Sequence, residues 1–161
     1  MKRRTFLQAL LGFPAALSFV PAVEASNKPN HDITPLNLSP EEWKGRLNGQ
    51  QFYVLREEGT ERAFTSPLND EKRKGEYRCA GCDLLMFTSE MKYDSGTGWP
   101  SFFTVVDGHI ETKTDFKLIY PRTEYHCVRC GGHQGHVFND GPKPTGQRWC
   151  NNGVALRFVP A

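Results

Sequence analysis

Two similar stretches, Glu76-Tyr77-Arg78-Cys79-Ala80-Gly81-Cys82 and Glu124-Tyr125-His126-Cys127-Val128-Arg129-Cys130, each end in a C-x-x-C pair, here called a cysteine knuckle. Each stretch predicts a strand, a knuckle and then a second strand. Two residues between cysteines let both thiolates face one ion from a tight turn. Two such knuckles complete a tetrahedral sulfur shell, which suits Zn²⁺. The spacing therefore predicts one structural zinc ion, held by Cys79, Cys82, Cys127 and Cys130.

Other interpretations of the four cysteines stay open at this point. They could form two disulfides or a dithiol redox pair, and an exported chain would permit disulfides. A C-x-x-C disulfide closes a very small loop and stabilises little, which favours the metal. His126 and His133 flank the second knuckle, and either could replace a cysteine as a ligand.

The composition indicates a mainly β protein of one domain. The chain has 161 residues, of which 38% are hydrophobic and 12% aromatic, with 15 glycines and 11 prolines. A lean, aromatic and turn-rich chain is typical of β-structure rather than of a helical bundle. No apolar run reaches the roughly 20 uninterrupted residues of a spanning helix, which excludes a multi-span membrane protein.

Local patterns place the expected elements along the chain. Ser39-Pro40-Glu41-Glu42 is a capping box, so a short helix is expected from there to about Gly49. Loops are expected at 69–75 and 139–147. Strands are predicted at 51–57, 75–79, 84–88, 101–106, 117–120, 136–138 and 154–159.

Residues 1–25 have the pattern of an export signal. Lys2, Arg3 and Arg4 form a basic start, a mostly apolar run follows, and a cleavage site is expected between Ala25 and Ser26. The paired arginines resemble a twin-arginine signal, which predicts a periplasmic protein; an uncleaved membrane anchor is the alternative. Residues 26–38 are expected to form a flexible lead-in and 39–161 the catalytic domain.

The formal net charge of +2 arises in the signal, because basic and acidic residues balance in the rest of the chain. A neutral body gives a nucleic-acid partner no electrostatic support. No stable membrane insertion is expected after cleavage, and the protein is expected to be a monomer.

Cys150 is the fifth cysteine and lies in Arg148-Trp149-Cys150-Asn151-Asn152. In an extended segment Arg148, Cys150 and Asn152 share one face, and a nearby cation favours the nucleophilic thiolate. His133 and His136 could supply acid–base chemistry to such a nucleophile. A buried, inert cysteine is the alternative. The turn at 94–102 presents Trp99, either to a ligand or simply to the core.

Together these pieces resemble the B-type methionine sulfoxide reductases. The resemblance runs from about Ser39 to Val159 and rests on the two knuckles and on four further motifs, GTERAF at 59–64, SGTGWPSF at 95–102, GHQGHVF at 132–138 and RWCNN with ALRF at 148–158. It implies two antiparallel sheets around the active site, with zinc at the far end, and thiol-dependent reduction of methionine-R-sulfoxide, free or in proteins.

The resemblance also implies residue roles. Cys150 matches the nucleophile, which becomes a sulfenic acid. His133 and His136 match the histidines that handle protons at the sulfoxide oxygen, and Trp99 matches the aromatic residue that packs on the S-methyl group. Asn152 and Arg148 match residues that shape and polarise the site.

Two positions depart from the family pattern. Thr97 stands where many relatives have a resolving cysteine, so an external thiol is expected to reduce the sulfenic acid: a thioredoxin-like protein, glutathione or a small dithiol. Gly153 stands where a serine is usual, and only a local packing effect is expected. The alternatives to a reductase are a non-catalytic zinc-ribbon binding module and a redox sensor.

Overall fold

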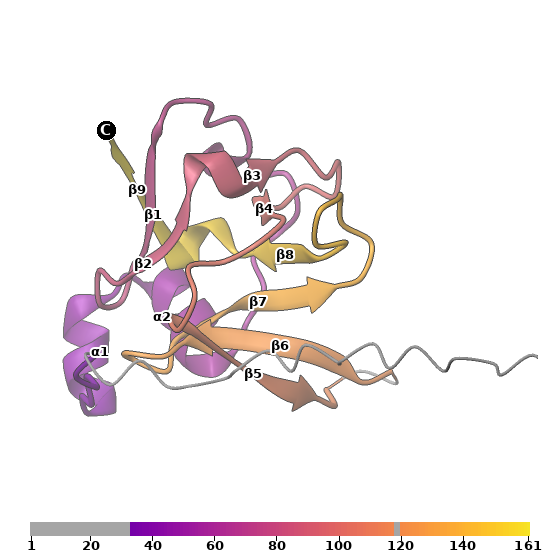
Figure 1. Ribbon diagram of the computed structural model, residues 1–161. Helices are drawn as coiled ribbons and strands as arrows, with labels where there is room; N and C mark the ends of the chain where they lie inside the picture. Colours follow the sequence, from indigo (N-terminus) through magenta and orange to yellow (C-terminus); the bar gives the residue numbers. More distant parts are fainter. Residues whose placement is uncertain (1–32, 118–119) are drawn as a thin grey trace, which may run out of the picture.

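Two antiparallel sheets carry the fold of the computed structural model, which describes residues 33–117 and 120–161 (Figure 1). The smaller sheet has the order β2-β1-β9 and the larger has the order β3-β4-β8-β7-β6-β5. The strands are Gly75–Cys79 (β1), Leu85–Thr88 (β2), Lys92–Tyr93 (β3), Ser101–Phe102 (β4), Ile110–Asp115 (β5), Arg122–Cys127 (β6), His133–Phe138 (β7), Arg148–Asn151 (β8) and Leu156–Pro160 (β9). This confirms the predicted mainly β fold with two antiparallel sheets.

Two helices, rather than the one predicted, precede the sheets. Helix α1, Pro40–Arg46, starts at the predicted capping box, where Ser39 and Glu42 exchange side-chain to backbone hydrogen bonds. Helix α2, Gly49–Glu57, replaces the strand predicted at 51–57, and that prediction was wrong. Asn48 and Gln51 form a second capping box, which starts a helix although the sequence that follows is rich in strand-favouring residues.

The remaining differences concern the strands, of which β3, β5 and β8 lie outside the predicted ranges. The predicted strand at 117–120 is not formed at its described residues, Lys117 and Tyr120; the antiparallel partners are β5 before it and β6 after it. Strand β4 ends at Phe102, well before the predicted Val106. Strand β9 begins at Leu156, two residues later than predicted, because a 3₁₀ turn, η3, occupies Gly153–Ala155.

An aromatic core joins the two sheets. Tyr77 and Phe87 of the smaller sheet and Phe102 and Tyr125 of the larger sheet are completely buried. The rings of Phe87 and Phe102 stack with centroids 3.9 Å apart, and Tyr77 meets Phe102 edge-on at 5.0 Å. The high aromatic content noted in the sequence therefore forms the contact between the sheets.

The ends of the described chain are packed on this body. Leu36 donates its backbone N–H to the Arg129 carbonyl, so the last part of the predicted lead-in, residues 33–38, is anchored to the second knuckle.

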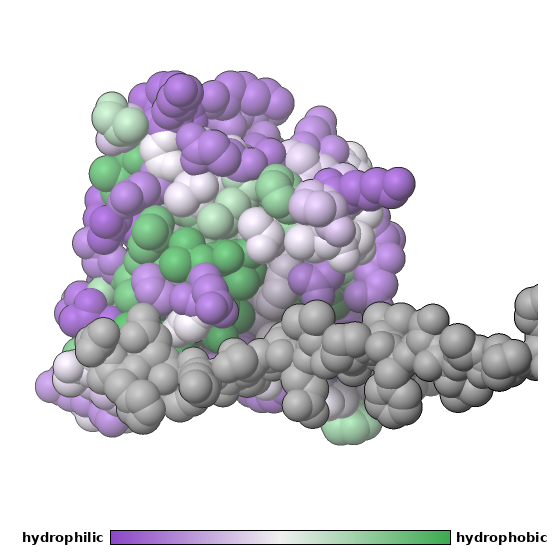
Figure 2. All heavy atoms as spheres, in the orientation of Figure 1, coloured by the Kyte–Doolittle hydropathy of each residue, from purple (hydrophilic) through white to green (hydrophobic). Residues whose placement is uncertain are grey.

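Figure 2 shows mostly hydrophilic side chains on one face, with apolar ones gathered over the smaller sheet. Within the described residues no helix has the length and apolarity to span a membrane. The predicted signal at 1–25 lies outside the described residues.

Candidate active site and metal centre

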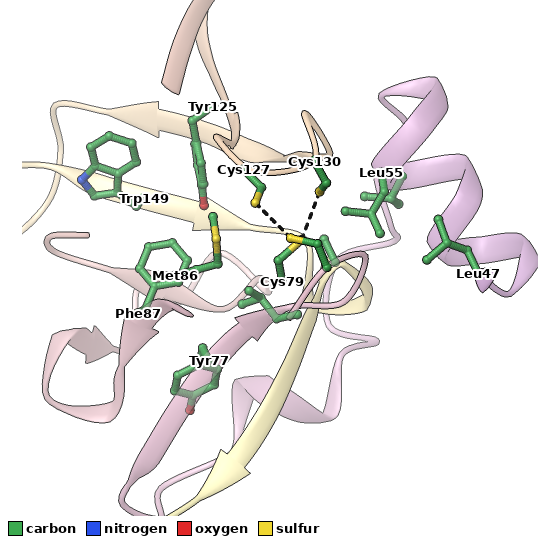
Figure 3. Close-up of a cluster of buried hydrophobic side chains, with 14 of the residues drawn as sticks. Leu47, Leu55, Tyr77, Cys79, Met86, Phe87, Tyr125, Cys127, Cys130 and Trp149 are labelled. Atoms are coloured by element: carbon green, nitrogen blue, oxygen red, sulfur yellow. Dashed lines mark hydrogen bonds between the residues drawn. The ribbon is translucent and has the colours of Figure 1, made fainter. Parts of the chain in front are cut away.

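The four knuckle cysteines meet at one point between the two sheets. Their sulfur atoms all lie within 4.8 Å of one another, and all four side chains are buried. Figure 3 shows Cys127 and Cys130 reaching down to the first knuckle from the end of β6 and the turn that follows it. The Sγ atoms of Cys79 and Cys130 are 3.6 Å apart, and those of Cys82 and Cys127 are 3.5 Å apart.

This sulfur geometry fits a tetrahedral metal site. Four sulfurs at about 2.3 Å from a zinc ion would lie about 3.8 Å from one another. The observed separations are close to that and far longer than the roughly 2.05 Å of a disulfide bond, and all five cysteines are free. The four cysteines can therefore hold a metal ion.

The two histidines beside the second knuckle do not join this cluster. His126 and His133 both direct Nδ1 to the carboxylate of Glu124, at 3.0 and 2.6 Å. The alternative in which a histidine replaces a cysteine is therefore not supported by the geometry. The amide of Gln134 instead lies next to the cluster and donates to Cys79 Sγ at 3.4 Å.

Cys150 lies in β8, near the middle of the larger sheet. Its strand neighbours are Ser101 on β4 and His136 on β7. Residues directly opposite one another on antiparallel strands have Cβ atoms about 4.5–5.5 Å apart, so the His136 ring and the Cys150 thiol share one face. A small cavity of about 110 Å³ opens over this face, and it is lined by Thr60, Trp99, Arg122, Gly135, His136, Phe138, Cys150, Asn151 and Asn152.

The structure thus brings together four residues that the sequence analysis singled out, Trp99, His136, Cys150 and Asn152, around one cavity. Arg148 and His133 are buried beside this cavity and do not line it. Arg148 is held by two hydrogen bonds to Asp140, at 2.8 and 2.9 Å, and lies over the ring of Phe138.

Burial is the main influence on the charge state of Cys150. It raises the pKa of the Cys150 thiol, although Arg148 and the Thr97 hydroxyl both act to lower this pKa. Arg148 has the predicted effect on the thiol, but the effect is smaller than the cost of burying the thiolate. The resting protein therefore holds Cys150 as a thiol at neutral pH.

Each of the two histidines of β7 is paired with a buried carboxylate. His136 Nε2 lies 2.8 Å from Asp115, and His133 Nδ1 lies 2.6 Å from Glu124. Their rings meet edge-on with centroids 5.4 Å apart. A carboxylate that accepts one ring N–H fixes the tautomer of a neutral imidazole and leaves the other nitrogen free to accept a proton. Among the described residues, His133 Nε2 is buried without a hydrogen-bond partner.

The Glu124 carboxylate is ionised, whereas the His136 ring is neutral. Burial acts to raise the pKa of Glu124, but hydrogen bonds from His126 and His133 lower it to about 2. Desolvation lowers the pKa of His136, against the effect of Asp115, so this ring is neutral at pH 7. The sequence analysis did not select Asp115 or Glu124. Glu124 did belong to the repeated Glu-Tyr-x-Cys stretch, which was the only available signal for it.

Thr97, the residue at the position where the sequence analysis expected no resolving cysteine, lies next to Cys150. Its hydroxyl acts to lower the pKa of the Cys150 thiol and hydrogen-bonds to Ser95 Oγ at 2.8 Å. Ser95 Oγ is in turn 2.8 Å from the buried Ser101 Oγ. The contact of Thr97 with Cys150 is therefore polar and cannot form a disulfide.

Glu61 connects Trp99 and Asn152, which both line the cavity; it belongs to the GTERAF motif at 59–64, but the sequence analysis assigned it no role. Its backbone carbonyl accepts a hydrogen bond from Trp99 Nε1 at 3.1 Å, and its N–H donates to Asn152 Oδ1 at 3.0 Å. Asn152 in turn donates from both its backbone and its side-chain amide to the Gln134 carbonyl, at 2.8 and 3.0 Å. Hydrogen bonds to backbone groups thus hold Trp99 and Asn152 in place at the cavity.

Comparison with known proteins gives one consistent result. Residues 47–160 match the model of the SelR domain. The chain is 49% identical over 124 residues to "Peptide methionine sulfoxide reductase MsrB" of Leptospira interrogans, covering 76% of this chain and 95% of that protein. It is 50% identical over 121 residues to the protein of the same name from Methanosarcina barkeri, covering 74% of this chain and 85% of that protein.

A plant relative is longer. The chain is 48% identical over 123 residues to "Peptide methionine sulfoxide reductase B1, chloroplastic" of Arabidopsis thaliana, which covers 76% of this chain and 61% of the plant protein. The similarity therefore spans about three fifths of that relative, and nearly the whole of the Leptospira protein.

Proposed function

This chain belongs to the SelR-domain family of peptide methionine sulfoxide reductases, and we propose that it reduces methionine-R-sulfoxide with Cys150 as the nucleophile. The position of Cys150 carries this proposal. It lies at a small cavity between an indole, a neutral imidazole and an amide. Trp99 offers an apolar surface to the S-methyl group, and Asn152 and His136 offer polar groups to the S–O bond.

The proposed reaction transfers one oxygen atom. The Cys150 sulfur attacks the sulfoxide sulfur and forms an S–S bond, while the S–O bond breaks and the protonated oxygen leaves as hydroxide. Hydroxide then adds to the Cys150 sulfur as the S–S bond breaks, which gives methionine and Cys150 sulfenic acid. Cys150 loses two electrons and the sulfoxide sulfur gains them. His136, neutral because burial lowers its pKa, takes the thiol proton and passes it to the departing oxygen. Asp115 stabilises the imidazolium that forms.

An external thiol completes the cycle. The four other cysteines lie together in the knuckle cluster, and Thr97 is the polar neighbour of Cys150. Two thiol groups of a thioredoxin-like protein, of glutathione or of a small dithiol would reduce the sulfenic acid to a thiol, releasing water and forming a disulfide. The substrate can be free methionine sulfoxide or the oxidised residue in a protein.

We further propose that Cys79, Cys82, Cys127 and Cys130 hold one zinc ion. A bound zinc ion would have a structural role, since four protein ligands leave no open coordination position. The donor set and the sulfur separations support this assignment. The cysteines themselves connect the turn after β1 to the turn after β6, and so tie the two sheets together.

Export to the periplasm is proposed on the sequence of residues 1–25 alone. Lys2, Arg3 and Arg4 precede a mostly apolar run, and the twin-arginine route carries folded proteins, which would let the metal be loaded before export. N-terminal sequencing of protein from the periplasmic fraction tests this. A mature chain starting at Ser26 is expected, whereas an intact Met1 in a membrane fraction would contradict it.

The central experiment counts methionine formed per protein from each sulfoxide epimer, with and without dithiothreitol. One equivalent from the R epimer, rising to many with dithiothreitol, is the expected result. Cys150→Ser is the matched control and should form none while keeping its fold and its zinc. If neither epimer yields methionine, the reductase assignment fails and a zinc-bound binding module becomes the better description.

A further inference from the structure

Glu61 makes four hydrogen bonds to residues distant in the sequence, and none of them is required by the secondary structure. Its carboxylate accepts the backbone N–H groups of Gly153 and Val154, at 2.6 and 3.0 Å. Its own backbone N–H and carbonyl bond to Asn152 Oδ1 and Trp99 Nε1. The side chain is partly buried in the segment between α2 and β1.

The carboxylate fixes Glu61 to the strand that carries the nucleophile. Gly153 and Val154 lie in η3, which is separated from the end of β8 by Asn152, and are three and four residues after Cys150. A carboxylate that accepts two backbone N–H groups forms charge-assisted hydrogen bonds, which are about twice as strong as neutral ones. The backbone of residue 61 is therefore held in register with β8.

Trp99 depends on this anchor for its position. It follows a turn in which Gly96 and Gly98 both adopt positive φ angles, of 70° and 89°. The only hydrogen bond of the indole among the described residues is the one to the Glu61 carbonyl. The backbone beside Trp99 is held to β8 by the Asn151 N–H, which donates to the Pro100 carbonyl at 2.9 Å, whereas the position of the indole ring relative to β8 is set through residue 61.

We propose that Glu61 is a positioning residue that sets the width of the alkyl site between Trp99 and Cys150, and so selects a methyl group over a larger one. This inference rests on the proposed function, since it assigns a specificity role at the same cavity. When the carboxylate is lost, residue 61 and the indole it holds can move away from β8. The site then loses contact with a methyl group and gains room for an ethyl group.

The first test measures the indole directly. Hydrogen exchange of the Trp99 indole N–H, followed by NMR in the unmodified protein, should be slow because the Glu61 carbonyl holds it. Glu61→Gln keeps the size of the side chain and should speed this exchange, whereas Glu57→Gln, at an exposed position of α2, should not. Fast exchange in the unmodified protein would overturn the proposal whether or not any variant folds.

The second test compares methionine sulfoxide with ethionine sulfoxide, which carries an S-ethyl group. In Glu61→Gln the KM for methionine sulfoxide is expected to rise about tenfold, the effect of losing a hydrogen bond to a charged group, with a smaller change in kcat. The preference for the S-methyl over the S-ethyl substrate should also fall in Glu61→Gln. In a Trp99→Ala background, Glu61→Gln should cause no further loss of preference.

The outcomes separate a positioning role from a purely structural one. Two results would show that Glu61 only stabilises the fold, and either would overturn the proposal. In the first, Glu61→Gln lowers activity equally for methionine sulfoxide and ethionine sulfoxide. In the second, Glu61→Gln lowers the methyl-over-ethyl preference by the same factor in the Trp99→Ala background as in the unmodified protein. If the unmodified protein reduces neither substrate, the proposed function fails, and the indole exchange still decides whether Glu61 positions Trp99.

Discussion

The replacement of Gly153 by serine tests the packing of η3, the turn after β8, against Ser66. A Cβ atom at position 153 would lie 1.8 Å from Ser66 Oγ and 2.6 Å from Ser66 Cβ. The Ser66 hydroxyl can rotate away, but its Cβ atom is fixed to the backbone. Gly153→Ser therefore forces one of the two backbone segments to move, and the local packing effect expected from the sequence becomes a specific clash with Ser66.

The size of the effect follows from overpacking a close contact. Inserting atoms into a well-packed site costs about 1–3 kcal/mol. For a domain of this size each kcal/mol lowers Tm by roughly 3–4 °C, so Gly153→Ser should lower Tm by roughly 3–12 °C. The displaced backbone N–H of residue 153 also donates to Glu61. KM should therefore rise together with the loss of stability.

A second substitution identifies Ser66 as the cause. Ser66→Gly removes both clashing atoms and by itself loses only the bond that Ser66 Oγ accepts from the Leu68 N–H, worth about 1 kcal/mol. The double variant should be more stable than the sum of the single effects predicts, with a coupling of about 1–2 kcal/mol. Ser66→Ala keeps the Cβ atom, so in the Gly153→Ser background it should restore less of the lost stability than Ser66→Gly. Urea and thermal unfolding measure all four stabilities; strictly additive effects, or a neutral Gly153→Ser, would refute the reasoning.

Three further predictions concern the thiols. Thr97→Cys places a sulfur beside Cys150, so one turnover should now yield an intramolecular disulfide seen by mass spectrometry; recovery of only a sulfenic acid would contradict the contact. Cys79→Ser should lose zinc and fold poorly, checked by metal analysis and thermal unfolding; unchanged stability without metal would contradict the role of the cluster. The rate of Cys150 alkylation should increase with pH through a midpoint above the ordinary thiol pKa of 9.0, because burial raises the pKa of Cys150. Arg148→Met should move this midpoint higher still, because Arg148 lowers the pKa of Cys150. A midpoint near neutral pH would refute this prediction.

The repeated strand–knuckle–strand pattern predicted much of the fold. It placed Cys79 at the end of β1 and Cys127 at the end of β6, as the structure shows. The error at 51–57 has a physical cause, since Phe52, Tyr53 and Val54 favour a strand locally. The Asn48 cap and the burial of Val54 and Leu55 against the core make the segment a helix.

The site was predictable only in part, because its supporting residues act over long separations. Cys150, His136 and Trp99 carry recognisable side-chain chemistry within short motifs. Glu61 bonds to residues 91 and 38 positions away through its backbone, and Asp115 meets His136 across 21 positions. No local pattern encodes such a contact, and backbone hydrogen bonds place little constraint on the type of residue.

The charge states in the cavity bear on how a partly buried thiol could act as the proposed nucleophile. Burial raises the pKa of Cys150 and lowers that of His136, so the resting pair is a neutral thiol beside a neutral imidazole. Forming a thiolate and an imidazolium there is unfavourable until a second dipole enters the cavity. In the proposed reaction the sulfoxide oxygen is such a dipole, and it would also receive the proton that His136 takes from the thiol. The low polarity that keeps Cys150 protonated at rest therefore couples its activation to the arrival of the substrate.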